Sequence, residues 1–230
     1  MVDRIKSGVP GFDKLVEGGL PRRSSILVSG TSGTGKSTFC SQFAINGAKN
    51  GENALVIQLE QERDEVLLDW ENFGWDVDKY IKSEKLAILK PQFHSVESML
   101  TQIEDVVRSL KVKRVVLDSS SVLGFYSHDK MQVRQNMLSV FRALKQLGCT
   151  SLVVTESEEG THHISTYGVE EYLADGVVVL YYIPQENQFF RAISVRKMRR
   201  TSHSQKLHPV RIESDGIHVY PDQPVFAKVR

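Results

Sequence analysis

Apolar runs of strand length alternate with amphipathic stretches of helix length along the first two thirds of the chain. Short runs rich in Val, Ile and Leu are typical of strands buried on both faces of a parallel sheet, and the amphipathic stretches are typical of helices that cover it. The predicted strands are 25–29, 54–59, 86–89, 114–117 and 150–155, and the predicted helices are 37–50, 63–73, 96–110 and 131–147. The pattern therefore predicts an α/β fold with a mostly parallel sheet and helices on both faces.

The last third of the chain has a different pattern. Two strand-like runs, 177–183 and 189–198, flank a polar turn at 184–188, which predicts an antiparallel hairpin. Short strands are also expected near 210–212 and 217–220. We therefore expect a C-terminal antiparallel β extension on the parallel core. Because no linker or internal repeat interrupts the sequence, residues 1–230 are predicted to form one domain.

Composition and charge narrow the function classes. Hydrophobic residues make up 40% and charged residues 25%, as in a globular protein, and the formal net charge of +1 gives no overall field that favours nucleic acid or an anionic membrane. The N-terminus has no apolar signal core and the run 176–183 is too short for a membrane helix, so a cytoplasmic protein without membrane association is expected. Cys40 and Cys149 lie in apolar stretches and are predicted to be buried thiols.

The strongest chemical signal begins at Gly30, where the sequence fits the phosphate-loop pattern G-x-x-x-x-G-K-[ST] between an apolar strand and a helix. Its glycines let backbone N–H groups converge on phosphates, and the helix adds its positive N-terminal end. Lys36 supplies a charge for the β- and γ-phosphates, and Ser37 offers a hydroxyl to Mg²⁺. The residues predicted to bind ATP or ADP are Gly30, Thr31, Ser32, Gly33, Thr34, Gly35, Lys36, Ser37 and Thr38.

Two acids follow apolar strands. Asp118 is predicted to hold Mg²⁺ through water, although an Asp after a strand is also suited to cap a helix. Glu60 is predicted to polarise the water that attacks the γ-phosphate, and the alternatives are a solvated acid at the end of a strand or an acid in the first turn of the next helix. Parallel strands bring both acids to the edge of the sheet where α/β proteins bind ligands.

Lys197 and Arg199 stand two apart on a predicted strand, so they project together. Three interpretations stay open: cations that reach a nucleotide across a subunit interface, a track for a nucleic-acid backbone, or a charged edge that prevents strand pairing. Neighbouring basic residues are Arg191, Arg196, Arg200, Lys206 and Arg211. Trp70 and Trp75 are predicted to pack in the core, and His162-His163 lacks further ligands for a metal site.

These motifs, in this order, resemble a single KaiC-like domain of the RecA superfamily, which includes the circadian clock ATPase and many archaeal paralogues. The resemblance implies a RecA-like P-loop NTPase core and usually a ring, commonly a hexamer, with ATP between subunits. It also implies that Lys197 and Arg199 act on the neighbour's nucleotide, with Thr201 and His203 close to it. The resemblance rests on 7–13, 17–21, 30–38, 59–61, 73–75, 116–119, 167–171, 197–203 and 215–217, and it places 212–214 near the base or ribose.

The sequence departs from the family pattern at two positions. Gln61 replaces the second of two paired glutamates, which predicts slower turnover, and Arg200 replaces the usual glycine after the two cations. Ser165 and Thr166 resemble the phosphorylated segment of the clock protein, but 167–171 resembles its non-phosphorylated domain, so self-phosphorylation is not expected.

Three functional hypotheses follow. The first is an oligomeric ATPase that hydrolyses ATP slowly at subunit interfaces and couples nucleotide state to assembly or partner binding. The second is a recombinase-paralogue-like protein that binds single-stranded DNA, which only the basic C-terminal region supports. The third is a nucleotide-gated scaffold with little hydrolysis, for which Gln61 is the main support.

Overall fold

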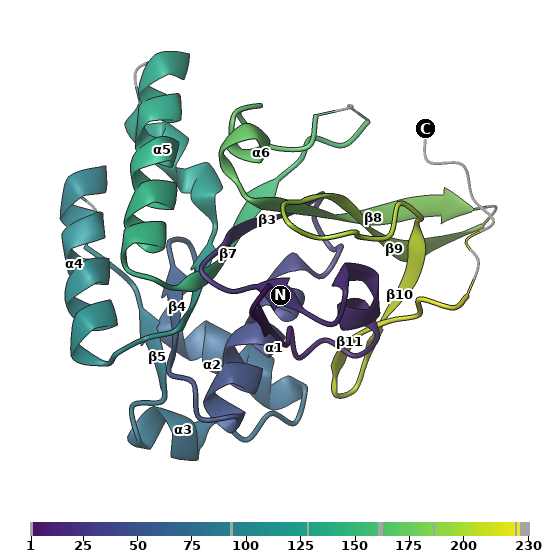
Figure 1. The fold of residues 1–230 in the computed structure, drawn as a ribbon, viewed down its shortest axis with the longest axis horizontal. Helices are drawn as coiled ribbons and strands as arrows, with labels where there is room; N and C mark the ends of the chain where they lie inside the picture. The colour runs from purple at the N-terminus through teal and green to yellow at the C-terminus, as the bar shows by residue number, and fades with distance from the viewer. Residues whose placement is uncertain are drawn as a thin grey trace.

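The computed structural model describes residues 2–92, 94–127, 129–160, 163–185, 187–223 and 225. Its core is a nine-stranded sheet in the order β11-β10-β9-β8-β3-β7-β6-β4-β5 (Figure 1). The strands are β3 (Ser25–Gly30), β4 (Ala54–Gln58), β5 (Leu86–Leu89), β6 (Arg114–Asp118), β7 (Thr150–Glu156), β8 (Gly176–Gln185), β9 (Gln188–Met198), β10 (His208–Glu213) and β11 (Gly216–Val219). Near the N-terminus, β1 (Arg4–Ile5) and β2 (Leu20–Pro21) form a separate antiparallel pair.

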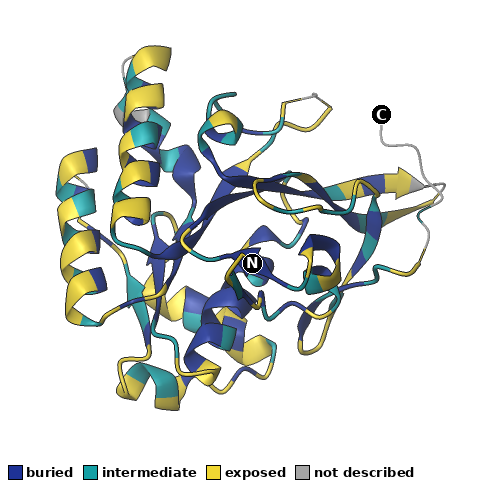
Figure 2. Ribbon diagram, viewed as in Figure 1, coloured by how far each residue is buried: buried dark blue, intermediate teal, exposed yellow. Residues whose placement is uncertain are grey.

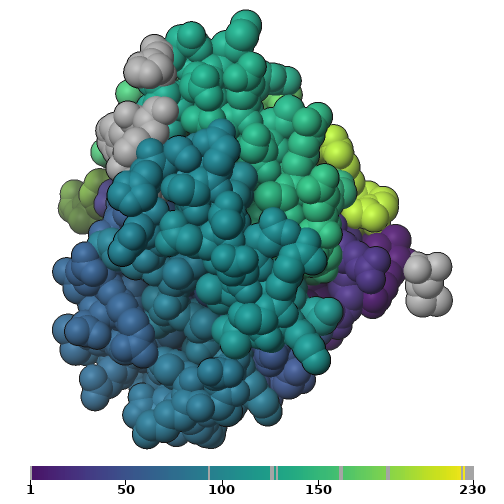
Figure 3. Space-filling view, turned by 90° about the vertical axis from the view of Figure 1, so that its left-hand side faces the viewer, coloured from purple at the N-terminus to yellow at the C-terminus, as the bar shows by residue number. Residues whose placement is uncertain are grey.

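Helices cover both faces of the sheet, and alternate strand residues point to the two sides. Ile26 and Val28 of β3 pack in the cluster that includes α1 and α2, whereas Leu27 packs in the cluster that includes α4 and α5. Figure 2 shows the strands buried between helices whose outer surfaces are exposed, and Figure 3 shows α4 and α5 covering one side of the molecule. The helices are α1 (Lys36–Lys49), α2 (Arg63–Asn72), α3 (Asp78–Lys82), α4 (Val96–Ser109), α5 (Lys130–Gln146) and α6 (Glu170–Leu173), with 3-10 helices η1 (Phe12–Val16) and η2 (Ser120–Tyr126).

The predicted fold class is confirmed. Strands β5, β4, β6, β7, β3 and β8 are mutually parallel, and β9, β10 and β11 extend the sheet with antiparallel pairs. The predicted helix and strand boundaries agree to within one or two residues outside the β8–β9 hairpin. The helix α3 was not predicted; it has five residues and none of them is buried, so it leaves no apolar period in the sequence.

The prediction that 184–188 form a polar turn was wrong. Pro184 pairs with Phe189 and Gln185 pairs with Gln188, so both strands run further toward the tip of the hairpin. Proline is tolerated there because the pairing of β8 with β3 ends at Val179, and the missing N–H of Pro184 interrupts no ladder on that side.

Several predictions about packing are confirmed. Cys40 and Cys149 are buried free thiols. Trp70 and Trp75 are buried in the core, and the indole N–H of Trp75 donates to the Asp215 carbonyl at 2.8 Å. Within the described residues, no helix is long and apolar enough to cross a membrane.

Candidate functional site

The phosphate loop follows β3, between the ends of β7 and β8. Gly30 ends the strand, and α1 begins at Lys36. A Cβ on Gly30 would lie 2.5 Å from the Leu180 carbonyl oxygen, so only glycine lets the loop leave β3 beside β8. Gly35 precedes α1 with a left-handed φ of 99°, which glycine adopts without strain. The loop is therefore shaped by its glycines and directs the N-terminus of a fourteen-residue helix toward it.

The Lys36 side chain lies inside this loop. Its ammonium donates hydrogen bonds of 2.8 Å to the carbonyl oxygens of Gly30 and Thr31. Burial lowers the pKa of Lys36, while the nearby carboxylates of Glu156 and Asp118 act in the opposite direction. The loop thus holds a cation at the end of β3, where parallel-sheet proteins bind anionic ligands.

Asp118 lies at the end of β6, two strands from the loop. Burial raises its pKa, as does the nearby carboxylate of Glu60, and a hydrogen bond from the Ser37 hydroxyl opposes the shift. Its peptide bond to Ser119 is cis. The alternative that Asp118 caps the next helix is not supported, because Ser119 occupies the N-cap of η2.

Glu60 lies just beyond β4, which pairs with β6. The Ser119 hydroxyl donates a 2.7 Å hydrogen bond to its carboxylate. The alternative that Glu60 is an acid in the first turn of the next helix is not supported, since α2 begins at Arg63. Gln61 instead donates to Asp69 of α2 at 3.4 Å, on the exposed surface.

The oxygen atoms beside Lys36 suit a magnesium ion. The Ser37 hydroxyl acts to lower the pKa of the Asp118 carboxyl, so the two groups lie close together. They are the hard oxygen donors that Mg²⁺ takes, commonly together with water and phosphate oxygens. Glu60 adds negative charge close to Asp118. The side chains present therefore fit a magnesium nucleotide.

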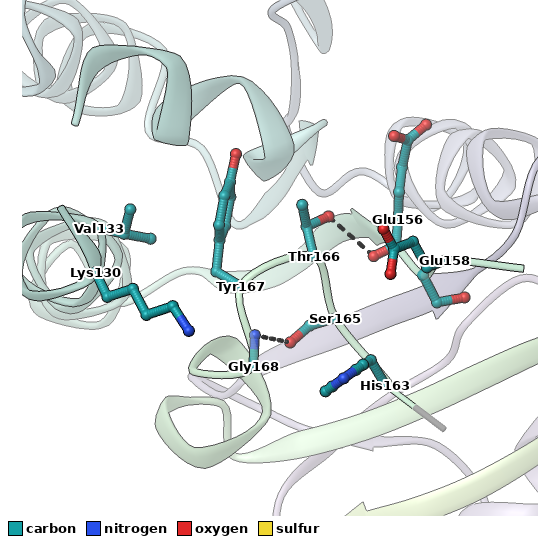
Figure 4. A pocket seen from close by; sticks show the side chains of 10 residues that line it. Lys130, Val133, Glu156, Glu158, His163, Ser165, Thr166, Tyr167 and Gly168 are labelled. Carbon is teal, nitrogen blue, oxygen red and sulfur yellow. Dashed lines mark hydrogen bonds between the residues drawn. The ribbon is translucent and has the colours of Figure 1, made fainter. Parts of the chain in front are cut away.

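Glu156, which the sequence analysis did not single out, belongs to the same site. It ends β7, which pairs with β3. Among the nearby charges, its carboxylate acts most strongly to raise the pKa of Lys36. It also lines a cavity of about 370 Å³, across which Lys130 of α5 extends toward the 163–168 segment (Figure 4). The rule that identified Glu60 and Asp118, an acid after an apolar strand, also applies to Glu156.

Ser165 and Thr166 lie on the wall of this cavity (Figure 4). Ser165 is buried, and its hydroxyl donates to the Glu171 carboxylate while accepting from the Gly168 N–H. Thr166 donates to the Glu156 carbonyl at 2.9 Å. Both hydroxyls thus hold the segment in place, and the absence of self-phosphorylation stays a prediction. His163 lines the cavity as well, whereas His162 lies outside the described residues.

Lys197 and Arg199 lie together, as predicted, but far from the phosphate loop of their own chain. Lys197 pairs with Val177 on β8, and Val177 pairs with Leu27 on β3, three residues before Gly30. The Lys197 ammonium donates to the carbonyl oxygens of Ala174 and Glu171 at 2.6 and 3.0 Å, near the start of β8. Arg199 pairs with Asp175 at 3.2 Å. Both cations therefore face the opposite end of the sheet.

The residues that follow these cations are held by local contacts. The Thr201 hydroxyl accepts a hydrogen bond from Arg4 at 3.0 Å, and His203 Nδ1 lies 2.9 Å from the Ser204 carbonyl oxygen. Within the described part of the chain, neither side chain forms a hydrogen bond with the phosphate loop. By contrast, Ile212 lies close to Gly35, 3.2 Å from where a Cβ would stand. The hairpin of β10 and β11 therefore borders the loop.

Arg191 of β9 contacts the phosphate loop directly. The sequence predicts it only as one of the basic residues near Lys197 and Arg199. Its Nε donates to the Gly33 carbonyl at 2.9 Å, and its guanidinium lies over the Tyr182 ring, 4.8 Å from the centroid. Tyr182 in turn stacks on Phe189, with 4.9 Å between the ring centroids. Arg191 and Gly33 are 158 positions apart, so no local sequence signal identifies this contact.

Comparison with known proteins agrees with this geometry. The sequence model of a family described as "ATPase: KaiC" matches residues 5–224. A UPF0273 protein of Aeropyrum pernix is 34% identical over 98% of this chain and 96% of its own length. The circadian clock protein KaiC3 of Synechocystis is 32% identical over 96% of this chain, which spans 46% of that longer protein.

A solved structure gives the same result. The crystal structure of a KaiC-like protein from Pyrococcus horikoshii OT3 superposes with a TM-score of 0.89 and 38% sequence identity, covering 96% of this chain and all of that one. The match includes the parallel core and its antiparallel extension, and it supports ATP binding and NTPase activity for the phosphate loop. The chain belongs to the KaiC family of RecA-fold ATPases.

Proposed function

We propose that this protein hydrolyses ATP slowly at interfaces between copies of itself. The observation that carries the proposal is the convergence of Lys36, Asp118 and Glu60 at one end of the sheet. At this end of the sheet, Lys36 provides a cation for phosphate oxygens, and the Asp118 carboxylate is suited to Mg²⁺. Glu60 provides an acid suited to activate a water molecule. When bound, the magnesium ion would supply charge neutralisation between the β- and γ-phosphates.

Each residue of the site has a separate role in binding or hydrolysis. Lys36 binds phosphate oxygens once a nucleotide replaces its two carbonyl partners, and the backbone N–H groups from Gly30 to Thr38 orient the phosphates. Ser37 would bind the metal ion directly, and Asp118 would hold it through water. Glu60 accepts the proton of the attacking water, and Ser119 fixes the carboxylate that does so.

The location of Lys197 and Arg199 supports an arrangement of several copies. Lys197 of β9 lies at the level of Leu27 in β3, on the face that α5 covers. Leu27 stands three residues before the end of β3, which is roughly 10 Å along the strand. These side chains are suited to stabilise charge on the phosphoryl group of a neighbouring copy. Thr201 and His203 follow them in the chain and would approach the same nucleotide. A hexameric ring is the assembly that we favour.

The proposal is tested by ATP hydrolysis and by mass in solution with ATP and Mg²⁺. We expect turnover that requires an oligomer and falls by at least 10²-fold in Glu60→Gln, with ATP binding retained. Lys36→Ala should lose both binding and turnover. Turnover that is unchanged in Glu60→Gln, or that persists in a confirmed monomer, would overturn the proposal.

Two further results would distinguish this proposal from the DNA-binding and scaffold functions. Stimulation of turnover by single-stranded DNA would favour the recombinase-like function over a partner-coupled ATPase. An assembly that binds ATP and lacks any turnover in the wild type would favour the nucleotide-gated scaffold. We expect turnover in the wild type, because Glu60 and Asp118 are both present and held in place. We expect no stimulation by DNA, because the formal net charge of +1 gives no overall field that attracts it.

A further inference from the structure

A basic pocket lies at the end of the sheet opposite the phosphate loop. Its cavity is about 710 Å³, and its charged lining consists of four cations and one carboxylate: Arg22, Arg23, Lys113, Arg200 and Asp3. Arg23 precedes β3, Lys113 precedes β6 and Arg200 follows β9, so three separate loops bring these side chains together. Thr150, at the start of β7 between β3 and β6, is buried at its floor.

The cations of this pocket are unequally neutralised. Arg22 pairs with Asp3 at 3.3 Å and with Glu52 at 2.7 Å, and Asp3 is the only carboxylate among the lining residues that the structure describes. Within the described part of the chain, the side chains of Arg23, Lys113 and Arg200 have no hydrogen bond and no carboxylate partner. Three exposed like charges around one cavity repel one another, and an anion in the cavity removes that repulsion.

The backbone of two of these cations is held in an unusual conformation. Arg23 has φ of 57° and Arg200 has φ of 62°, in the left-handed region where glycine is favoured and a side chain costs about 1 kcal/mol. Backbone contacts fix both positions: the Arg23 N–H donates to the Thr150 hydroxyl at 3.0 Å, and the Arg200 carbonyl accepts from Arg4 at 3.2 Å. Two strained positions that carry arginine, and that face the same cavity, indicate a site rather than an accidental charge cluster.

The lining also indicates the class of ligand. Guanidinium groups bind phosphate oxygens in a bidentate manner, and an ammonium group adds a point charge. Among the described residues of the lining, Val2 is the one apolar side chain longer than alanine, so these residues offer a base or an acyl chain little surface to contact. Gly148, also in the lining, leaves room for a ligand because nothing lies within 4 Å of where its Cβ would stand.

We propose that this pocket binds the phosphate groups of a polyanion, separately from the nucleotide at the phosphate loop. A free oligophosphate and the backbone of a nucleic acid share this chemistry. Lys113 and the two left-handed arginines contact the phosphates, while Arg22 stays paired with its two carboxylates.

The test uses inorganic tripolyphosphate and the full chain carrying Lys36→Ala, which disables the phosphate loop and makes the result independent of hydrolysis. Calorimetry at about 50 mM salt should detect one tripolyphosphate per chain. Adding Arg23→Gly and Arg200→Gly should weaken binding at least tenfold. These glycines relieve left-handed strain, so a loss of binding reports the lost charges rather than a failure to fold.

A matched control is Lys111→Gly, which removes one cation from another left-handed position, φ of 51°, outside the lining of the pocket. On the Lys36→Ala background it should change affinity less than twofold. No binding by the Lys36→Ala chain, or equal binding with and without the two arginines, would overturn the proposal. A third outcome would also overturn it: replacing the two arginines changes the mass of the protein in solution, and tripolyphosphate does not bind. That result would identify the pocket as a contact between copies of the chain.

A labelled sixteen-nucleotide strand distinguishes the two sources of phosphate. If a nucleic-acid backbone is the ligand, the strand displaces tripolyphosphate at lower concentration, and its affinity falls with salt with a log–log slope near about −2 for three contacts. If a compact phosphate is the ligand, tripolyphosphate binds and the strand does not compete. Either result requires the same two arginines.

Discussion

The Ser119 hydroxyl donates a hydrogen bond of 2.7 Å to the carboxylate of Glu60. Glu60 extends from β4 and Ser119 follows β6, so the bond joins the acid of one strand to the loop of its neighbour. The negative charge of Glu60 acts to raise the pKa of both Asp118 and Lys36, so the carboxylate lies close to these two side chains. The Ser119 side chain is therefore a positioning residue for the acid that we assign to water activation.

Removing this hydroxyl should slow hydrolysis without weakening nucleotide binding. In Ser119→Ala the Glu60 carboxylate loses its fixed orientation, and we expect kcat to fall about tenfold with little change in KM. Ser119→Thr keeps the hydroxyl and should restore most of the rate. Steady-state kinetics of both variants test this; an equal loss in the two, or a loss confined to KM, would assign the serine a structural role instead.

The Arg114–Glu52 pair should stabilise the fold. Arg114 is buried at the start of β6, where its guanidinium pairs with Glu52 at 2.6 Å, donates to the carbonyl oxygens of Lys6 and Phe43, and lies over the Phe43 ring. Glu52→Ala leaves this buried charge without its carboxylate, and we expect the free energy of unfolding to fall by about 3 kcal/mol. Urea unfolding measures the change.

The control for this prediction is an exposed pair. Glu104 and Arg108 stand one helical turn apart on α4, with 48% of the Glu104 side chain and 69% of the Arg108 side chain in solvent. Glu104→Ala should cost less than about 0.5 kcal/mol, because exposed ion pairs contribute little. Similar losses in the two variants would show that the burial of Arg114 does not determine the energy.

The stability of the fold should depend on pH through His208. Burial lowers the pKa of this imidazole, whose Nδ1 lies 3.1 Å from the Pro221 carbonyl oxygen and whose Nε2 lies 2.7 Å from the Ser204 hydroxyl. The carbonyl oxygen only accepts, so Nδ1 donates and Nε2 accepts in the neutral ring. The unfolded chain, with an ordinary pKa of about 6.5, then binds the proton more readily than the folded one.

Stability is consequently lost as pH falls below about 6.5, toward the lower pKa of the folded state. The urea midpoint of the wild type should decrease between about pH 7.5 and pH 5.5, and the decrease should be smaller in His208→Gln, which cannot titrate there. Equal pH dependence in the two proteins would show that other groups cause it.

The sequence predicts the parallel core well because its strands are buried on both faces. Ile26, Leu27 and Val28 contact opposite helical layers, and such a continuous apolar run has few other stable placements. The phosphate loop and Asp118 are predicted for the same reason, since each follows directly from one of these strands. The same argument would identify Glu156, which ends β7.

Other parts of the site depend on contacts that no local pattern records. Arg191 reaches Gly33 through the pairing of β9 with β8, which decides where the side chain lies only after the sheet has formed. The basic pocket is similar, because Arg23, Lys113 and Arg200 are far apart in sequence and meet at the ends of three strands. The positive φ angles of Arg23 and Arg200 also leave no signal, since arginine is not a residue that indicates a left-handed turn.

The most direct test of the account is to mix two inactive variants, Lys36→Ala and Arg199→Ala, and to measure ATP hydrolysis. Each is expected to have little turnover alone: the first lacks the phosphate-loop cation and the second lacks the cation offered to its neighbour. In randomly mixed oligomers about one quarter of the interfaces combine an intact loop with an intact arginine, so the mixture should recover about a quarter of the wild-type rate. A mixture that stays inactive under conditions where the subunits exchange, or an Arg199→Ala variant as active as the wild type, would contradict hydrolysis at shared interfaces.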